Sequence, residues 1–442
     1  MSSPYLSDDC IYCILKYLQD DRSTLFNCLL VNRLWCRETV PLLYKNPFNQ
    51  LSYEYNKKSK IIFNFILCFD KAEILRFKNQ LNQYNININD VNINDIIKEP
   101  LFEYSKYIEY YDYLVINRII FFWFWEYLNI KEDHGIVREF ILTFHQSNLR
   151  KSINIKQSII SFQFDYQDYN IKSIPQNFSN LKSLSLCDIN LKPNKGEVLL
   201  KKFQKHSLVY IEFVAISFRD ISFEYLIILY NLKYLNFYNC DGLSIDQCRI
   251  LNFASFKLKE LTIKSNIWND KVTSSIIKYL GESLQKLYFH GDLTILIIEY
   301  LSLYCLNLNN LKITIEPEIA FSLIPYFKNL RIKISIQFFS DFQYTIFGFK
   351  HTILLKAFFE NLPHHFETIS LNINIHSVYL KIILNYIKKE NNSLKFFGMG
   401  KLERVLNDEE TKLLDQIRAR GVSLIYFSSI YHECTPITYN LI

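Results

Sequence analysis

The chain contains little glycine, and no stretch of it is long and apolar enough to cross a membrane. Only 9 of its 442 residues are glycine, against an ordinary share of about 7%. Loops that hold a phosphate or a dinucleotide need glycine where the backbone approaches the ligand, so this scarcity argues against such folds. A membrane span needs about 20 apolar residues, and the best candidate, 114–128, is interrupted by Arg118 and Glu126. Residues 101–128 have a helical pattern, and we interpret 114–128 as a buried helix.

Neither sign of charge is in large excess. Lys and Arg total 50 and Asp and Glu total 44, which gives a net charge of +6. That is small for a nucleic-acid-binding chain of this length. Asp8, Asp9, Asp20 and Asp21 lie where a secretory signal needs a basic start and an apolar stretch. The ten cysteines are scattered, which is typical of free thiols in a reducing compartment. We therefore expect a cytoplasmic or nuclear protein with no nucleic-acid and no membrane partner.

No motif predicts a catalytic or metal site. Cys10 and Cys13 are spaced as a CxxC, but the spacing of Cys28 and Cys36 does not complete a four-thiolate zinc site. We expect Cys10 and Cys13 to pack as small apolar side chains on an amphipathic helix. The Gly-Met-Gly-Lys at 398–401 lacks the upstream spacing of a phosphate loop. The sequence thus predicts a non-enzymatic protein with no metal and no cofactor.

Residues 6–48 carry the pattern of three short helices. Ser7 is a good helix N-cap, and Asp8 and Asp9 fall in the first turn, where the helix dipole favours negative charge. Apolar residues then recur at helical spacing. The side chains expected to hold this unit together are Leu15, Leu18, Val31 and Trp35. Because a core of this size is only marginally stable, we expect part of the apolar surface to bind a partner.

A repeat begins at residue 181 and decides the fold class. Its template is an apolar residue, two free positions, an apolar residue, one free position and an apolar residue. The first anchors of six matches lie 27, 24, 26, 26 and 24 residues apart. These matches are Leu181-Leu184-Leu186, Leu208-Ile211-Phe213, Leu232-Leu235-Phe237, Leu258-Leu261-Ile263, Leu284-Leu287-Phe289 and Leu308-Leu311-Ile313. Less regular matches follow at Phe327-Leu330-Ile332, Phe366-Ile369-Leu371 and Leu394-Phe397-Met399. A helix over 408–420 and a strand over 422–427 are expected to close the array, and residues 149–166 to open it.

Helical patterns such as 222–230, 272–280 and 295–305 lie between the anchors. A strand and a helix of this size cannot bury their apolar faces alone, but stacked units share a core and form a solenoid. We therefore predict an α/β fold, a horseshoe with parallel strands on the concave face and helices outside. Strand residues alternate between the core and that concave face. Tyrosines and basic residues recur at its free positions, and Tyr is favoured at interfaces. The expected target-binding residues are Tyr210, Tyr234, Asn236, Tyr238, Lys264, Lys286, Tyr288, His290, Lys312 and Arg331.

Two segments resemble known families. Cys240 stands at the ninth repeat position, where cysteine-containing leucine-rich repeats place Asn or Cys, and Asn266 takes that position one repeat later. The segment LSDDCIYCILKYLQDDRSTLFNCLLVNRLWCRET resembles an F-box. One departure is Ser7, because F-boxes usually have Pro directly after the opening Leu. An F-box followed by leucine-rich repeats is an established architecture, and the chain is similar to it from end to end.

The resemblance implies the substrate-recognition subunit of a cullin–RING (SCF-type) ubiquitin ligase. An F-box over 1–48 would bind a Skp-family adaptor and through it a cullin. A helical or irregular region over 49–148 would connect it to repeats over 149–442, which would bind a protein target for ubiquitin-dependent degradation. The alternative is a leucine-rich-repeat interaction scaffold outside a ligase, and Ser7 is its support. The residues that the resemblance places in the F-box and its adaptor contact are Leu6, Ser7, Ile11, Ile14, Leu15, Leu18, Leu25, Leu29, Val31 and Trp35.

Overall fold

The computed structural model divides the chain into two compact units. The first contains the described residues up to 187 together with 207–208, and the second contains those from 209 onward. The domain boundaries expected at residues 48 and 148 stay predictions. The described residues are 6–48, 55–84, 100–130, 135–161, 180–187, 207–219, 221–315, 319, 323, 325–326, 333–338, 349–361, 366–371, 377–389, 394–399 and 406–426.

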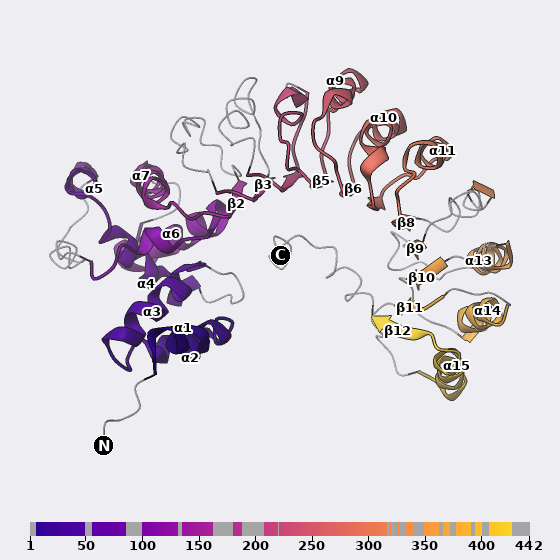
Figure 1. Ribbon diagram of the computed structural model, residues 1–442, viewed down its shortest axis with the longest axis horizontal. Helices are drawn as coiled ribbons and strands as arrows, with labels where there is room; N and C mark the ends of the chain where they lie inside the picture. Colours follow the sequence, from indigo (N-terminus) through magenta and orange to yellow (C-terminus); the bar gives the residue numbers. More distant parts are fainter. Residues whose placement is uncertain are drawn as a thin grey trace. The chain divides into compact units, whose positions relative to one another are not determined.

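Three capped helices begin the first unit, as the sequence predicts. They are α1 (Asp8–Tyr17), α2 (Arg22–Cys28) and α3 (Arg33–Tyr44), drawn in the darkest colours of Figure 1. In each, the side-chain oxygen of the residue before the helix accepts a hydrogen bond from a backbone N–H of the first turn. This satisfies one of the N–H groups that have no partner within the helix. The pairs are Ser7 with Cys10 at 3.3 Å, Asp21 with Thr24 at 3.1 Å and Asn32 with Leu34 at 2.9 Å.

The rest of the first unit packs helices beside three parallel strands. The helical pattern expected over 101–128 is broken by a strand, β1, because Asp112 caps a helix that starts at Tyr113: its Oδ1 accepts the N–H of Val115 at 3.1 Å. β1 pairs with β2, and β2 with β3, all in parallel. The elements are α4 (Tyr55–Ile66), α5 (Lys71–Gln83), η3 (Tyr104–Tyr107), β1 (Tyr110–Asp112), α6 (Tyr113–Leu128), α7 (Gly135–Lys151), β2 (Gln157–Ser161) and β3 (Ser183–Cys187).

The expected buried helix is α6, and its aromatic side chains form much of the core of the first unit. Trp123 and Phe124 are fully buried. Trp123 stacks on Phe140 of α7 with ring centroids 5.6 Å apart. Trp125, at the end of the apolar run, is instead 59% exposed. Among the described residues, no helix is both long enough and apolar enough to cross a membrane.

The second unit alternates parallel strands with helices. Strands β4 to β9 pair with their neighbours in chain order, as do β9 to β12. Figure 1 places the labelled helices α9, α10, α11, α13, α14 and α15 on the same side of this row of strands. The strands are β4 (Tyr210–Val214), β5 (Tyr234–Tyr238), β6 (Glu260–Lys264), β7 (Lys286–His290), β8 (Asn310–Ile315), β9 (Lys333–Phe338), β10 (Phe366–Leu371), β11 (Phe396–Met399) and β12 (Ser423–Tyr426). The helices are η5 (Phe223–Tyr225), α9 (Ile245–Arg249), η6 (Ile250–Phe253), α10 (Asp270–Leu280), η7 (Gly281–Ser283), α11 (Ile295–Tyr304), α13 (Phe349–Asn361), α14 (Ser377–Ile387) and α15 (Asp408–Ala419).

The predicted repeat phase is confirmed for the six regular repeats. Every anchor side chain in them is at most 5% exposed. The expected closing helix and strand are α15 and β12. The match at Phe327-Leu330-Ile332 lies outside the described residues. In the next described strand, β9, Ile334 and Ile336 pair in register with Leu311 and Ile313. The helix expected over 222–230 is only the short η5.

Asn266 and Cys240 join consecutive repeats at the ninth position. The Oδ1 of Asn266 accepts the backbone N–H of Cys240 at 2.8 Å, and its Nδ2 donates to the carbonyl of Phe237 at 3.1 Å. Cys240 is fully buried beneath the strand ends. The residues just before this position, Asn239 and Ser265, both have φ of 52°, a left-handed conformation that turns the chain back into the core. The ninth-position pattern therefore marks a hydrogen-bonded connection between repeats.

Candidate interaction surfaces

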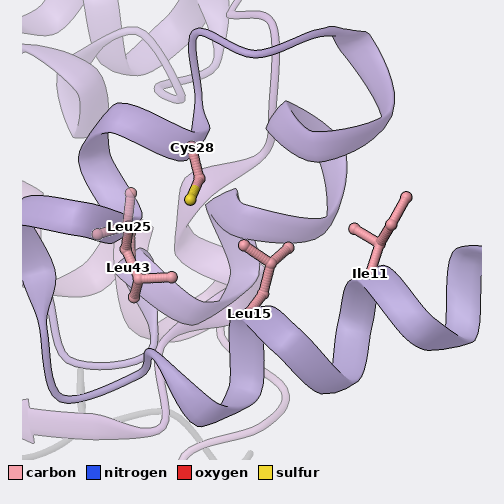
Figure 2. Close-up of a cluster of buried hydrophobic side chains, with 5 residues drawn as sticks. All are labelled: Ile11, Leu15, Leu25, Cys28 and Leu43. Carbon is pink, nitrogen blue, oxygen red and sulfur yellow. The ribbon is translucent and has the colours of Figure 1, made fainter. Parts of the chain in front are cut away.

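The N-terminal helices have a small core of their own (Figure 2). Ile11 and Leu15 extend from one face of α1 toward Leu25, Cys28 and Leu43. Leu18, Leu29 and Trp35 are partly buried and pack against this cluster. Of the four side chains expected to hold the unit together, Leu15, Leu18 and Trp35 therefore belong to it. Val31 does not, because it lies in the turn between α2 and α3 and is 58% exposed.

A second apolar stripe on α1 faces solvent. Cys10, Cys13, Ile14 and Tyr17 are spaced i, i+3, i+4 and i+7, so they share one helix face, and all four are exposed. The expectation that Cys10 and Cys13 pack as small apolar side chains is wrong: both are exposed, because the core of this unit lies on the adjacent face of α1. Tyr17 is 89% exposed. The remaining exposed large apolar side chains of this segment are Leu6, Tyr12, Phe26, Leu30 and Val31.

The residues implied at the adaptor contact differ in exposure, and Leu18, Leu29 and Trp35 are partly buried. Ile11, Leu15 and Leu25 are buried, so they support the helical unit without offering a surface. Ser7 is the N-cap of α1, which gives this position a local role that Pro would not fill, since Pro has no side-chain oxygen. Leu6, Ile14 and Val31 are exposed and available to a partner. Tyr17, Phe26 and Leu30 are also exposed but are not among the residues predicted from the sequence; the i, i+3, i+4, i+7 spacing of the second stripe indicates Tyr17 alone.

The expected target-binding residues share one side of the parallel strands. We call this side the strand face, defined by the first, third and fifth residues of β4 to β8. Strand register aligns them in rows across the sheet. Arg331 lies outside the described residues. The first row is Tyr210, Tyr234, Glu260, Lys286 and Asn310; the third-position row is Glu212, Asn236, Thr262, Tyr288 and Lys312; the fifth-position row is Val214, Tyr238, Lys264, His290 and Thr314.

Tyrosines and lysines of the strand face contact one another. The Lys264 ammonium lies 4.8 Å from the centroid of the Tyr238 ring, and that of Lys312 lies 5.0 Å from the Tyr288 ring. Both distances fit a cation–π contact. Asn236 is buried, and its Nδ2 donates to the hydroxyl of Tyr210 at 2.8 Å. These contacts hold the aromatic rings in defined positions, as a binding surface requires.

The strand face also carries two carboxylates. Glu212 is 1% exposed, and its side chain is hydrogen-bonded to Tyr210. Burial raises the pKa of the Glu260 carboxyl, and the nearby charges of Lys286 and Lys312 oppose that rise. Lys286 Nζ lies 3.8 Å from Glu260 Oε2. The two carboxylates therefore lie on β4 and β6, and the lysines Lys264, Lys286 and Lys312 lie on β6, β7 and β8.

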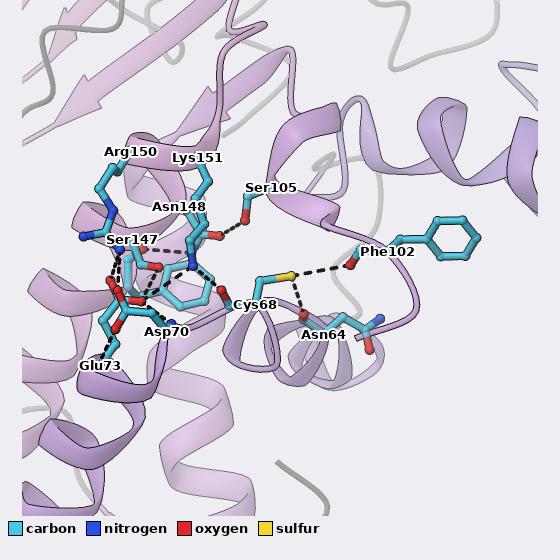
Figure 3. Close-up of polar contacts among 11 residues, drawn as sticks. Asn64, Cys68, Asp70, Glu73, Phe102, Ser105, Ser147, Asn148, Arg150 and Lys151 are labelled. Carbon is cyan, nitrogen blue, oxygen red and sulfur yellow. Dashed lines mark hydrogen bonds and ion pairs between the residues drawn. The ribbon is translucent and has the colours of Figure 1, made fainter. Parts of the chain in front are cut away.

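A dense polar cluster in the first unit has a structural role (Figure 3). Arg150 of α7 binds Asp70 at 2.8 Å and Glu73 at 2.9 Å, and Ser147 donates to Glu73 at 2.9 Å. Asp70 and Glu73 also cap α5 reciprocally. Burial raises the pKa of the Cys68 thiol, so little nucleophilic thiolate forms at neutral pH. The cluster fastens α5 to α7 and offers no activated nucleophile.

His145 forms a buried hydrogen-bonded chain between two helices and a strand. Its Nδ1 lies 2.8 Å from the hydroxyl of Tyr111, and its Nε2 lies 2.7 Å from Oδ1 of Asn117. Burial lowers the pKa of His145 to about 3. The imidazole therefore stays neutral under ordinary conditions and, being 3% exposed, does not reach a substrate. Across the described residues, no group of three or more His, Cys, Asp or Glu side chains is placed to hold a metal ion.

No protein-family model matches the chain, and no curated protein matches it at a significant level.

Proposed function

We propose that the chain is the substrate-recognition subunit of an SCF-type ubiquitin ligase. The observation that carries the proposal is the solvent-facing apolar stripe of α1, Cys10-Cys13-Ile14-Tyr17, on a helical unit that has its own separate core. An exposed apolar surface of this kind marks a protein–protein contact. Together with the F-box-like sequence of residues 6–48, it points to a Skp-family adaptor as the occupant, and through the adaptor to a cullin.

The strand face of the second unit would hold the target. Its rows of Tyr, Asn and Lys side chains lie on parallel strands whose other face is buried against the solenoid core. Rigid strands fix such side chains better than loops do. In this arrangement the chain performs no chemistry. It raises the local concentration of target lysines beside the ubiquitin-charged enzyme, which is catalysis by proximity.

Direct binding of a purified Skp-family adaptor tests the proposal. The adaptor is titrated into the full chain and into the variant Ile14→Lys with Tyr17→Lys, which places two charges on the stripe. Gln416→Lys, at an exposed position on α15, is the charge-bearing control. We expect the wild type and the control to bind equally and the double variant to lose at least about tenfold in affinity, because desolvating a lysine opposes docking.

The alternative, a leucine-rich-repeat scaffold outside a ligase, makes the opposite prediction. A scaffold would bind its target through the strand face but would not bind the adaptor. Failure of the wild-type chain to bind any Skp-family adaptor, while the chain stays folded, would favour the scaffold.

A further inference from the structure

The first row of the strand face orders its side chains by chemical type. Tyr210 and Tyr234 come first, Glu260 and Lys286 follow, and Asn310 is last. Successive members lie on neighbouring strands, about 4.8 Å apart. The row thus runs from aromatic to acidic to basic to amide across four strand spacings, perpendicular to the strands.

The aromatic side chains of this row are held in place by neighbouring residues of the strand face. The rings of Tyr210 and Tyr234 lie with centroids 6.5 Å apart. Tyr210 is fixed by the amide of Asn236 and by the buried Glu212. Tyr234 is next to Glu260 in register. A tyrosine ring beside a carboxylate is a favourable place for a cation, since the ring face and the carboxylate both attract positive charge.

Glu260 and Lys286 form only a loose ion pair. The side chain of Glu260 is 25% exposed and that of Lys286 is 50% exposed. Their separation of 3.8 Å lies beyond hydrogen-bond distance. The charges of both Lys286 and Lys312 act on this carboxylate. A closer N–H donor can still bind it, because the Lys286 ammonium lies beyond hydrogen-bond distance, and the half-exposed Lys286 can bind an anion instead.

We propose that this row recognises an extended segment of the target in which a basic and an acidic residue are two positions apart. The basic side chain lies between the Tyr234 ring and the Glu260 carboxylate, and the acidic side chain binds Lys286 beside Asn310. The distance from a point midway between Tyr234 and Glu260 to Lys286 is one and a half strand spacings, about 7 Å. Residues i and i+2 of an extended chain project to the same side about 6.8 Å apart. Arginine suits the basic position better than lysine, because it both stacks on a ring and binds a carboxylate through two N–H groups.

The inference rests on the proposed role of the strand face in target binding, but its test is independent of the ligase. The full chain is immobilised and used to select from a randomised peptide library, and the retained peptides are sequenced. The selection is repeated with Glu260→Gln, with Lys286→Gln and with the control Asp246→Asn, an exposed carboxylate on α9.

We expect the wild type and the Asp246→Asn control to enrich peptides with Arg or Lys two positions from Asp or Glu. Glu260→Gln is expected to reduce enrichment of the basic residue by about three- to tenfold and to leave the acidic preference, because it removes only one of the two charge contacts. Lys286→Gln is expected to do the reverse. The inference is overturned if the wild-type selection does not enrich the paired charges. It is also overturned if each variant loses both preferences, or if each variant keeps both. Adaptor binding without this preference would refute the inference alone, whereas the preference without adaptor binding would refute the ligase role alone.

Discussion

The backbone carbonyl of Lys45 accepts hydrogen bonds from the N–H groups of both Glu109, at 2.9 Å, and Tyr110, at 3.2 Å. The Lys45 ammonium also lies 3.3 Å from the Glu109 carboxylate. Lys45 directly follows α3, and Glu109 directly precedes β1. The same pattern, one carbonyl accepting two consecutive N–H groups, recurs from Glu109 to Lys156 and from Lys233 to Lys259. Lys45, at the end of the helical segment, therefore makes to β1 the same backbone contact that one repeat makes to the next.

The core and the exposed stripe of α1 are expected to respond differently to truncation. Leu15→Ala removes a fully buried side chain and should cost about 2–5 kcal/mol of unfolding free energy. Tyr17→Ala removes an exposed one and should change that free energy by no more than about 0.5 kcal/mol. Denaturant unfolding of both variants measures this. Equal destabilisation would mean that the two faces of α1 are wrongly assigned.

The phase of the repeats is tested by a pair of neighbouring substitutions. Leu235→Asp puts an unpaired charge into the shared core, where Leu235 is fully buried, and should unfold the adjacent repeats. Lys233→Asp changes an exposed side chain and should alter stability by no more than about 0.5 kcal/mol. Thermal unfolding followed by circular dichroism compares them, and identical melting curves would show that the phase is mistaken.

Two titratable groups of the first unit, the buried His145 and the partly buried Asp112, should have opposite effects on stability as pH falls. The folded-state pKa of His145 is lowered to about 3 by burial, so the unfolded chain binds this proton more readily and stability is lost as pH falls below about 6.5. The pKa of Asp112 is raised to about 6 by burial, so the folded chain binds this proton more readily and stability is gained as pH falls through about 6 toward 3.8. Between those values the two effects offset each other.

Asp112→Asn removes one side of that balance while keeping a residue that caps helices well. As pH falls from about 6 to about 4, the variant should lose about 1.4 kcal/mol of unfolding free energy per pH unit relative to wild type, because the His145 effect is then unopposed. Chemical unfolding across this range, on both proteins, gives the difference directly. Parallel pH profiles would show that Asp112 does not titrate as its burial implies.

Aromatic side chains of the strand face should dominate target capture. Tyr234→Ala with Tyr238→Ala is expected to cost about 2 kcal/mol or more, roughly thirtyfold in affinity for a captured peptide, because central aromatic side chains carry most interface energy. Adaptor affinity should not change, since the substituted residues belong to a different unit from α1. Retention of peptide binding by this double variant would place the target site elsewhere on the chain.

The six regular repeats could be predicted from the sequence because each apolar anchor is a position that the fold must bury. The template falls on residues such as Leu235 and Leu261, whose side chains are fully buried and whose strands pair in register. The match at Phe327, Leu330 and Ile332 lies outside the described residues, and the template does not mark β9 itself. Arg331 stands where the template would need its first apolar residue for Ile334 and Ile336, so the pairing of Leu311 with Ile334 locates this strand and the template does not.

The candidate surfaces were less predictable than the fold. Helical periodicity marks both apolar stripes of α1 but does not say which one is covered, so it does not show that Cys10 and Cys13 are exposed. The loose pair of Glu260 and Lys286 depends on which residues meet across β6 and β7. The repeat template aligns these two residues, but the 3.8 Å separation of their charged atoms depends on how the side chains lie in the assembled sheet, which the sequence does not give.

Co-purification of the adaptor and a cullin with the tagged full-length chain tests the ligase role most directly. The wild type and Gln416→Lys should retain both partners, and Ile14→Lys with Tyr17→Lys should lose both while keeping the wild-type melting temperature. If the correctly folded double variant retains the adaptor and cullin at wild-type yield, the stripe on α1 is not the docking surface. If the wild-type chain captures neither, the proposed ligase role is contradicted.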